Sequence, residues 1–91
     1  MNYYILDYTT SDDYLEERGK YRKEHLNHAT KYFNEGYLIL GGAIDVANEA
    51  VLVFNAESKE IAEAFAQNDP YVKNGLIESW SVKKWNVVIG N

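Results

Sequence analysis

The order of its strand-like and helix-like segments is the feature that most limits what this chain of 91 residues can fold into. Four short runs are rich in β-branched and aromatic residues, and two longer runs carry apolar residues at helical spacing. We expect strands at 3–8, 37–40, 50–55 and 76–89, and helices at 13–34 and 58–68. The resulting order, β-α-β-β-α-β, predicts an α+β ferredoxin-like fold with one antiparallel sheet and both helices on one face.

The apolar positions within each segment predict which side chains are buried. For the first helix the expected stripe is Leu15, Leu26, Ala29 and Phe33, with Tyr21 and Tyr32 beside it. For the second helix it is Ile61, Ala62, Phe65 and Ala66. Leu38 and Leu40 are expected on one face of the second strand. Trp80 and Val82 are expected to point inward from the last strand, and a change of phase at 83–85 predicts a bulge or a break there.

Both faces of the expected sheet carry apolar side chains. Tyr4, Leu6 and Tyr8 point to one side of the first strand, whereas Tyr3 and Ile5 point to the other. Two helices can cover only one face, and a sheet that is wet on its other face normally alternates apolar and polar residues. We therefore expect a second copy to pack sheet against sheet, which gives a homodimeric α/β barrel. The length of the chain predicts that residues 1–91 form a single domain.

The composition excludes several classes of function. Because the chain has no cysteine, it can form no disulfide, no thiolate nucleophile and no cysteine-based metal site. Its formal net charge of −5 argues against nucleic acid or an anionic membrane as a partner, since both attract basic surfaces. No apolar run reaches membrane-spanning length, and the first residues lack the pattern of a signal peptide. We therefore expect a soluble, cytoplasmic protein.

The turn around the sole proline, Asp69-Pro70-Tyr71-Val72, holds the first candidate for chemistry. Asp69 precedes a residue of fixed φ, a position from which a carboxylate can accept backbone N–H groups. One interpretation is that Asp69 only caps its own turn, and residue types alone favour it. The other is that the turn presents Asp69 to His25 on the first helix, so that carboxylate and imidazole form a functional pair.

Arg18, Arg22 and His25 fall at i, i+4 and i+7 of the first helix and therefore line one of its faces. For Arg18 and Lys20 we favour a solvated basic ridge that is paired with glutamates. His25 and His28 are three residues apart, but no carboxylate motif completes a metal set, so we expect no metal site. We also expect no cofactor, because the chain has neither a glycine-rich phosphate loop nor a redox-cofactor fingerprint.

Several short motifs resemble, in order and spacing, those of the YciI-like (YCII-related) family. They are Leu15-Glu16-Glu17-Arg18, Arg22, His25-Leu26, Glu35-Gly36, Gly41-Gly42, Asp69-Pro70-Tyr71-Val72 with Gly75, and Val82-Lys83-Lys84-Trp85. The resemblance covers nearly the whole chain. The sequence departs from the family pattern at Ala43 and Lys84, where proline is frequent, and both differences concern backbone rigidity rather than chemistry.

The resemblance implies a ferredoxin-like dimer with a His–Asp pair in a cleft, and the matching residues here are His25 and Asp69. Relatives of known chemistry include a dehydrochlorinase of chlorinated hydroxyquinols, and the wider dimeric barrel group includes muconolactone isomerase and small monooxygenases. A carboxylate that accepts the ring N–H of a histidine fixes its tautomer and leaves the other nitrogen free as a base. Such a pair suits proton abstraction next to a carbonyl group.

This chemistry predicts a cofactor-independent lyase or isomerase that acts on a small aromatic or enolisable acid. Arg22 can bind an anionic group of the substrate, and the amides of Gly41 and Gly42 can meet a developing oxyanion. Tyr8 and Tyr71 are expected to line the pocket. Two alternatives remain open: a non-catalytic small-ligand-binding dimeric module, and a pair that only ties the turn to the first helix.

Overall fold

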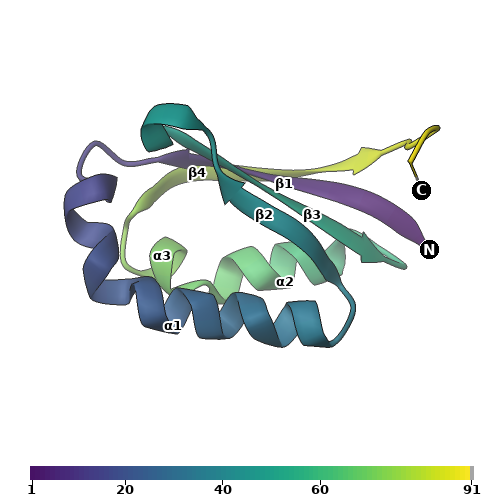
Figure 1. The fold of residues 1–91 in the computed structure, drawn as a ribbon, viewed down its shortest axis with the longest axis horizontal. Coiled ribbons are helices and arrows are strands. Elements are labelled where there is room, and N and C mark those ends of the chain that lie inside the picture. The colour runs from purple at the N-terminus through teal and green to yellow at the C-terminus, as the bar shows by residue number, and fades with distance from the viewer. Residues whose placement is uncertain (91) are drawn as a thin grey trace.

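Residues 1–90, which the computed structural model describes, form one four-stranded antiparallel sheet in the order β2-β3-β1-β4 (Figure 1). The strands are β1 (Asn2–Thr10), β2 (Leu38–Ala43), β3 (Glu49–Ala56) and β4 (Ile77–Trp85). On one face of the sheet lie the helices α1 (Tyr14–Asn34), α2 (Glu60–Asn68) and the short α3 (Pro70–Lys73). A single 3-10 turn, η1 (Asp45–Ala47), joins β2 to β3. The predicted ferredoxin-like fold is confirmed, and α3 is a helix where the sequence predicted only a turn.

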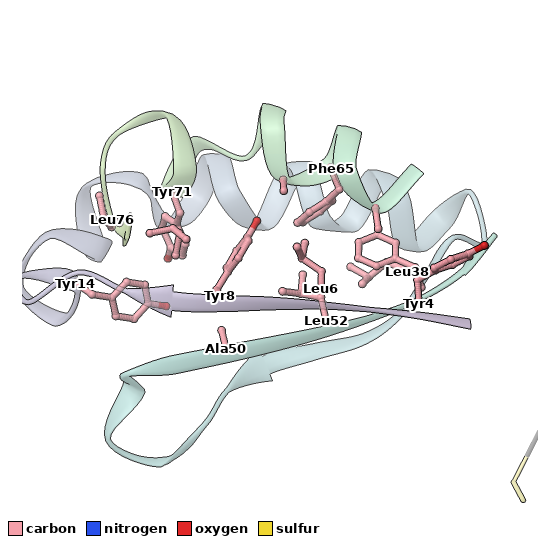
Figure 2. Packing of buried hydrophobic residues seen from close by; sticks show 14 residues of the cluster. Tyr4, Leu6, Tyr8, Tyr14, Leu38, Ala50, Leu52, Phe65, Tyr71 and Leu76 are labelled. Carbon is pink, nitrogen blue, oxygen red and sulfur yellow. The ribbon is translucent and has the colours of Figure 1, made fainter. Parts of the chain in front are cut away.

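The core lies between the helices and the inner face of the sheet, with β1 at its centre. Figure 2 shows Tyr4, Leu6 and Tyr8 of β1 pointing toward the helices. The inward residues are Tyr4, Leu6 and Tyr8 of β1, Leu52 and Phe54 of β3, and Trp80 and Val82 of β4, as their cross-strand pairing shows. From α2, the expected face of Ala62, Phe65 and Ala66 is fully buried, and Ile61 packs beside it. The rings of Phe54 and Phe65 meet edge to face at 5.3 Å.

Helix α1 contacts the core with tyrosines and histidines rather than with the predicted stripe of leucines. Leu15, Leu26 and Phe33 of that stripe are exposed. The face that packs inward carries Tyr14, Tyr21, His25, His28, Ala29 and Tyr32. These rings bury an apolar body and keep a polar tip, so the same face can pack and also form a site. Among residues 1–90, no helix, α1 included, is both long and apolar enough to span a membrane.

Strand β4 ends earlier and is more regular than expected. Its register with β1 is continuous over 79–85, so the bulge predicted as one alternative at 83–85 is wrong. The other alternative, a break, agrees with the end of the strand at Trp85. The register shifts instead between Thr9 and Thr10 of β1. Because β4 is an edge strand, its two lysines reach water from either face without a break in the ladder.

Strand β2 contains an irregularity at Ile39, where its register with β3 shifts between Leu38 and Leu40. Leu38 pairs with Phe54 and faces the core, whereas Leu40 pairs with Val53 and faces away from the helices. The prediction that the two leucines share a face is therefore wrong. The extra residue reverses the alternation of side chains, which a regular strand would have kept.

Gly41 and Gly42 follow this bulge and differ in the space around them. A Cβ at Gly41 would lie 3.0 Å from Cγ of Leu52, whereas none of the surrounding atoms comes within 4 Å of a Cβ at Gly42. We expect Gly41→Ala to lower the free energy of unfolding by about 1–3 kcal/mol, because buried Leu52 must move. The matched variant Gly42→Ala should be neutral or stabilising by up to about 1 kcal/mol. Urea unfolding measures both, and equal stabilities would contradict a packing role for Gly41.

Candidate functional site

Asp69 is the buried centre of the candidate site. Its side chain is 0% exposed, and three donors from residues 1–90 reach it. The backbone N–H of Tyr71 donates to Oδ1 at 3.0 Å, and Nδ1 of His25 lies 2.7 Å from the same oxygen. The hydroxyl of Tyr8 donates to Oδ2 at 2.7 Å. The carboxylate therefore makes both of the contacts considered from the sequence: it caps its own turn and it also contacts His25.

The local sequence explains why a carboxylate sits at this position. Asp69 is the N-cap of α3, with extended backbone angles (φ −68°, ψ 124°), and Pro70 occupies the first helical position, where no N–H is needed. Gly75, at φ 79°, then turns the chain into β4. Since α3 packs against α1, the cap of α3 meets the face of α1 that carries His25.

The imidazole of His25 is held from two directions. Because Tyr71 N–H and Tyr8 O–H already donate to Asp69, the carboxylate is placed to accept the Nδ1–H of His25 as a third hydrogen bond. The ring of Tyr71 stacks on the imidazole, with centroids 3.9 Å apart and planes 7° apart. This arrangement fixes the tautomer and the plane of the ring. It leaves Nε2 without a hydrogen-bond partner in residues 1–90, and the side chain is 17% exposed.

His25 lines a cavity of about 340 Å³ between α1 and the strands β2 and β3. The predicted site residues that line it are Tyr8, Arg22, His25, Gly41, Gly42 and Tyr71. Further lining comes from Tyr14, Arg18, Leu26, Ala29, Leu38, Ala43, Ala50 and Leu52. Asp69 lies behind His25 and does not line the cavity. The structure thus brings all the predicted site residues together, with the carboxylate in a supporting position.

Tyr8 acts on Asp69 rather than on a ligand, because its hydroxyl is occupied by Oδ2 of the carboxylate. It was expected only as a pocket-lining residue. Burial, the negative charge of Asp69 and the hydrogen bond to it all raise the pKa of Tyr8 far above its usual range. The phenol therefore stays protonated at neutral pH, where it donates to Asp69 and holds the carboxylate in place for His25.

The pKa shift of Tyr8 predicts a loss of stability in alkali. Its folded-state pKa is raised, so the stabilisation is fully present below about pH 10, the pKa of an unfolded tyrosine, and is lost as the pH rises above it. Tyr8→Phe should make the decline of the unfolding free energy above pH 10 shallower by about 1.4 kcal/mol per pH unit. Urea unfolding between pH 9 and 11 measures this, and identical slopes in parent and variant would contradict it.

The two glycine amides are not equivalent donors for an oxyanion. The N–H of Ile44 donates to the carbonyl of Glu49 at 2.8 Å, which makes these residues a hydrogen-bonded pair of the β2–β3 ladder. Along an antiparallel strand, successive N–H groups point alternately toward the partner strand and away from it. The N–H of Gly42 therefore points toward β3, and that of Gly41 points toward the free edge of β2. Only the Gly41 amide of the predicted pair is therefore available to a ligand.

Arg18 lines the cavity one helical turn before Arg22, so the prediction of a solvated ridge is wrong for Arg18. Its guanidinium lies 5.7 Å from the ring centroid of Tyr14, another lining residue that the sequence analysis missed. The signal that could have found both is their spacing, since Tyr14, Arg18, Arg22 and His25 share one face of α1. Lys20, by contrast, is exposed and pairs with Glu17 at 3.0 Å, as expected.

His28 contacts α2 and, unlike His25, does not line the cavity. Its Nε2 donates to the carbonyl of Phe65 at 2.9 Å, and its ring stacks on the ring of Phe65 at 4.5 Å. Because a carbonyl oxygen can only accept, Nε2 of His28 carries the proton. His28 therefore ties α1 to α2, and the two histidines hold opposite tautomers.

Comparison with known proteins agrees with the sequence motifs. A family model, the YCII-related domain, matches residues 1–86. Protein YciI of Escherichia coli is 30% identical over 95 residues, which cover 93% of this chain and 97% of that protein. Protein YciI of Shigella flexneri matches equally well.

Solved structures share the fold at lower sequence identity. A 5-chloro-2-hydroxyhydroquinone dehydrochlorinase from Burkholderia phenoliruptrix, in complex with 2,5-dihydroxybenzoquinone, superposes with a TM-score of 0.77 and 22% identity, over 92% of this chain and 93% of that chain. A protein from Agrobacterium tumefaciens gives a TM-score of 0.64 and 16% identity, over 98% of this chain and 95% of that chain. At these identities the likeness shows the fold alone. The family model and the relatives at 30% identity show that this chain belongs to the YCII-related domain family.

Proposed function

We propose that this protein is a cofactor-independent lyase or isomerase that removes a proton from a small, anionic, enolisable acid. The observation that carries the proposal is the 2.7 Å contact between Nδ1 of His25 and the buried carboxylate of Asp69, at the wall of a cavity. A carboxylate is only an acceptor, so it takes the Nδ1–H and leaves Nε2 as the basic nitrogen. The cavity volume of about 340 Å³ suits a small molecule.

In the proposed reaction, Nε2 of His25 accepts a proton from a carbon next to a carbonyl group. The electron pair of the broken C–H bond moves toward the carbonyl oxygen and gives an enolate. Return of the proton to another carbon completes an isomerisation, whereas departure of a leaving group with its bonding pair completes an elimination. Arg22 holds an anionic group of the substrate, and the edge amide of Gly41 is the donor for the developing oxyanion.

The dehydrochlorinase from Burkholderia phenoliruptrix supports this class of reaction at the level of the fold. Its name denotes an elimination of hydrogen chloride, and its structure holds 2,5-dihydroxybenzoquinone, a planar and enolic molecule. One fold hosts many unrelated functions, and function depends on the residues of the site. The weight of the proposal therefore rests on His25, Asp69 and the cavity of this chain.

The proposal is tested by incubating the full chain in D2O with a panel of small enolisable acids that includes a chlorinated hydroxyquinol. Exchange of a C–H for deuterium reports proton abstraction even where no product accumulates, and chromatography reports products. We expect exchange with at least one member of the panel, and its loss in His25→Ala. Binding without exchange by any member would instead favour the alternative, a non-catalytic small-ligand-binding module.

We also propose that two copies pair through the sheet face that points away from the helices. Cross-strand pairing places Ile5, Leu40, Val51, Val53 and Trp85 on this face. Leu40 is 63% exposed and Trp85 is 47% exposed. A second sheet packed on this face would bury the apolar residues, as in sheet-on-sheet packing.

Sedimentation equilibrium tests the pairing. We expect a dimer at micromolar concentration, and at least a tenfold weaker dimer in Leu40→Asp, which corresponds to about 1.4 kcal/mol. Because Leu40 is largely exposed in the single chain, the substitution should leave the fold intact, as judged by circular dichroism. A parent protein that remains monomeric at this concentration would contradict the proposal.

A further inference from the structure

The cavity is basic although the chain as a whole is acidic. Arg18, Arg22 and His25 line it, and the described lining contains no carboxylate. The ion pairs within residues 1–90 are Lys20–Glu17, His25–Asp69 and Lys83–Asp7, so none of them engages either guanidinium. In a chain with a formal net charge of −5, this local concentration of positive charge favours an anionic ligand.

Tyr71 supplies an independent observation that points to a ligand. The residue is 3% exposed and lines the cavity, yet its hydroxyl finds no acceptor for its proton within residues 1–90. A buried hydroxyl without an acceptor for its proton is costly, so an acceptor is expected there when the site is filled. The ring is fixed on both sides, because it stacks on His25 at 3.9 Å and meets the edge of Tyr14 at 5.7 Å.

The charges near this hydroxyl identify its neighbours. Burial, aided by Tyr14, raises the pKa of Tyr71, whereas the charges of Arg22 and Arg18 and a hydrogen bond from Arg22 to the phenolic oxygen act in the opposite direction. The hydroxyl is therefore protonated at neutral pH and can donate. Both arginines lie close enough to influence the pKa of the hydroxyl. Two guanidinium groups and one phenolic donor therefore lie near the same part of the cavity.

We propose that Arg18, Arg22 and the hydroxyl of Tyr71 form a carboxylate-binding subsite. The substrate is then a monocyclic aromatic or unsaturated carboxylic acid, whose ring lies against the apolar wall of Leu26, Ala29, Leu38 and Leu52. Only the placement of the reacting end at His25 rests on the proposed function. The subsite itself requires no turnover, because it is defined by recognition of a carboxylate.

Benzoate and benzamide test the subsite, because they have the same shape and differ in charge. Their dissociation constants are measured by NMR titration of the backbone amides of the full chain, without any reaction. We expect benzoate to bind at least tenfold more tightly than benzamide at low salt. Arg18→Gln, Arg22→Gln and Tyr71→Phe should each weaken benzoate binding by about tenfold and weaken benzamide binding by less, because the neutral amide accepts weaker hydrogen bonds than the carboxylate.

Lys20→Gln is the matched control. Lys20 lies on the same helix with its side chain 63% exposed, and the substitution removes the same charge as the arginine variants do. It should leave the preference for benzoate unchanged. The proposal is overturned if benzoate shows no preference over benzamide, if neither molecule binds, or if Lys20→Gln weakens benzoate binding as much as the arginine variants do. A preference for benzoate in a protein that exchanges no substrate proton would keep the subsite and remove the proposed catalysis. Exchange of a substrate proton in a protein that does not prefer benzoate would keep the proposed catalysis and remove the subsite.

Discussion

A His25→Ala variant is expected to abstract substrate protons about 10²–10⁴-fold more slowly than the parent, the usual contribution of a positioned general base. The variant removes Nε2, the basic nitrogen, together with the ring that Tyr71 stacks on. Asp69 keeps two of its donors, the Tyr71 amide and the Tyr8 hydroxyl, so the free energy of unfolding should fall by only about 1–3 kcal/mol. Deuterium exchange measures the first effect, and urea unfolding measures the second.

His28→Ala is the matched control for this experiment. His28 lies on the same helix and also bonds to a buried acceptor, the carbonyl of Phe65, but it does not line the cavity. Its replacement should cost stability and leave the rate of proton abstraction within about threefold of the parent. If the two histidine variants lose activity equally, or if His25→Ala loses only stability, the pair merely ties α3 to α1 and the proposed base is wrong.

Replacement of Asp69 by alanine should lower the free energy of unfolding by about 3–5 kcal/mol, because three donors lose their common acceptor at a cost of about 1–3 kcal/mol for each buried one. The carboxylate is fully buried, and its loss leaves the Tyr8 hydroxyl, the Tyr71 amide and the ring of His25 without their acceptor. Each stranded buried donor is destabilising because water cannot replace the lost bond. The loss is a large fraction of the 5–15 kcal/mol that stabilises an ordinary domain.

Asp13→Ala provides the comparison, because Asp13 accepts a hydrogen bond from Ser11 at the same distance of 2.7 Å but does so on the surface. It should cost less than about 1 kcal/mol. Asp69→Asn should lie between the two, since one amide oxygen still accepts while the NH2 group opposes a donor. An Asp69→Ala variant as stable as Asp13→Ala would mean that the buried network contributes little to the fold.

The fold was predictable because local patterns and topology agree. The periodicity of α2, the apolar alternation of β1 and the single proline each limit the arrangement without help from the rest of the chain. The errors lie where one residue changes a register. The bulge at Ile39 sends Leu40 to the outer face, and no signal in the sequence distinguishes it from a regular strand.

The site was predictable in its members but less so in their roles. The spacing of Arg22 and His25 placed both on one face of α1, and the Asp69-Pro70 sequence indicated a cap, because helix faces and caps follow local rules. The pairing of His25 with Asp69 was favoured by the family resemblance, since the residue types alone favoured a cap. The engagement of Tyr8 with Asp69, the stack of Tyr71 on His25 and the inward position of Arg18 depend on packing between distant segments. Contacts between side chains that are far apart in the sequence arise from tertiary structure, so the local patterns of a single sequence do not predict them.

The central claim is that Asp69 holds His25 as the Nδ1-protonated tautomer with a free Nε2. Nitrogen-15 NMR of the imidazole rings at neutral pH tests it directly in the full chain, which has two histidines. The account predicts an Nδ1–H tautomer for His25, an Nε2–H tautomer for His28 as the internal reference, and loss of the fixed tautomer of His25 alone in Asp69→Asn. An Nε2–H tautomer for His25 in the parent, or spectra of His25 that do not change in Asp69→Asn, would contradict it.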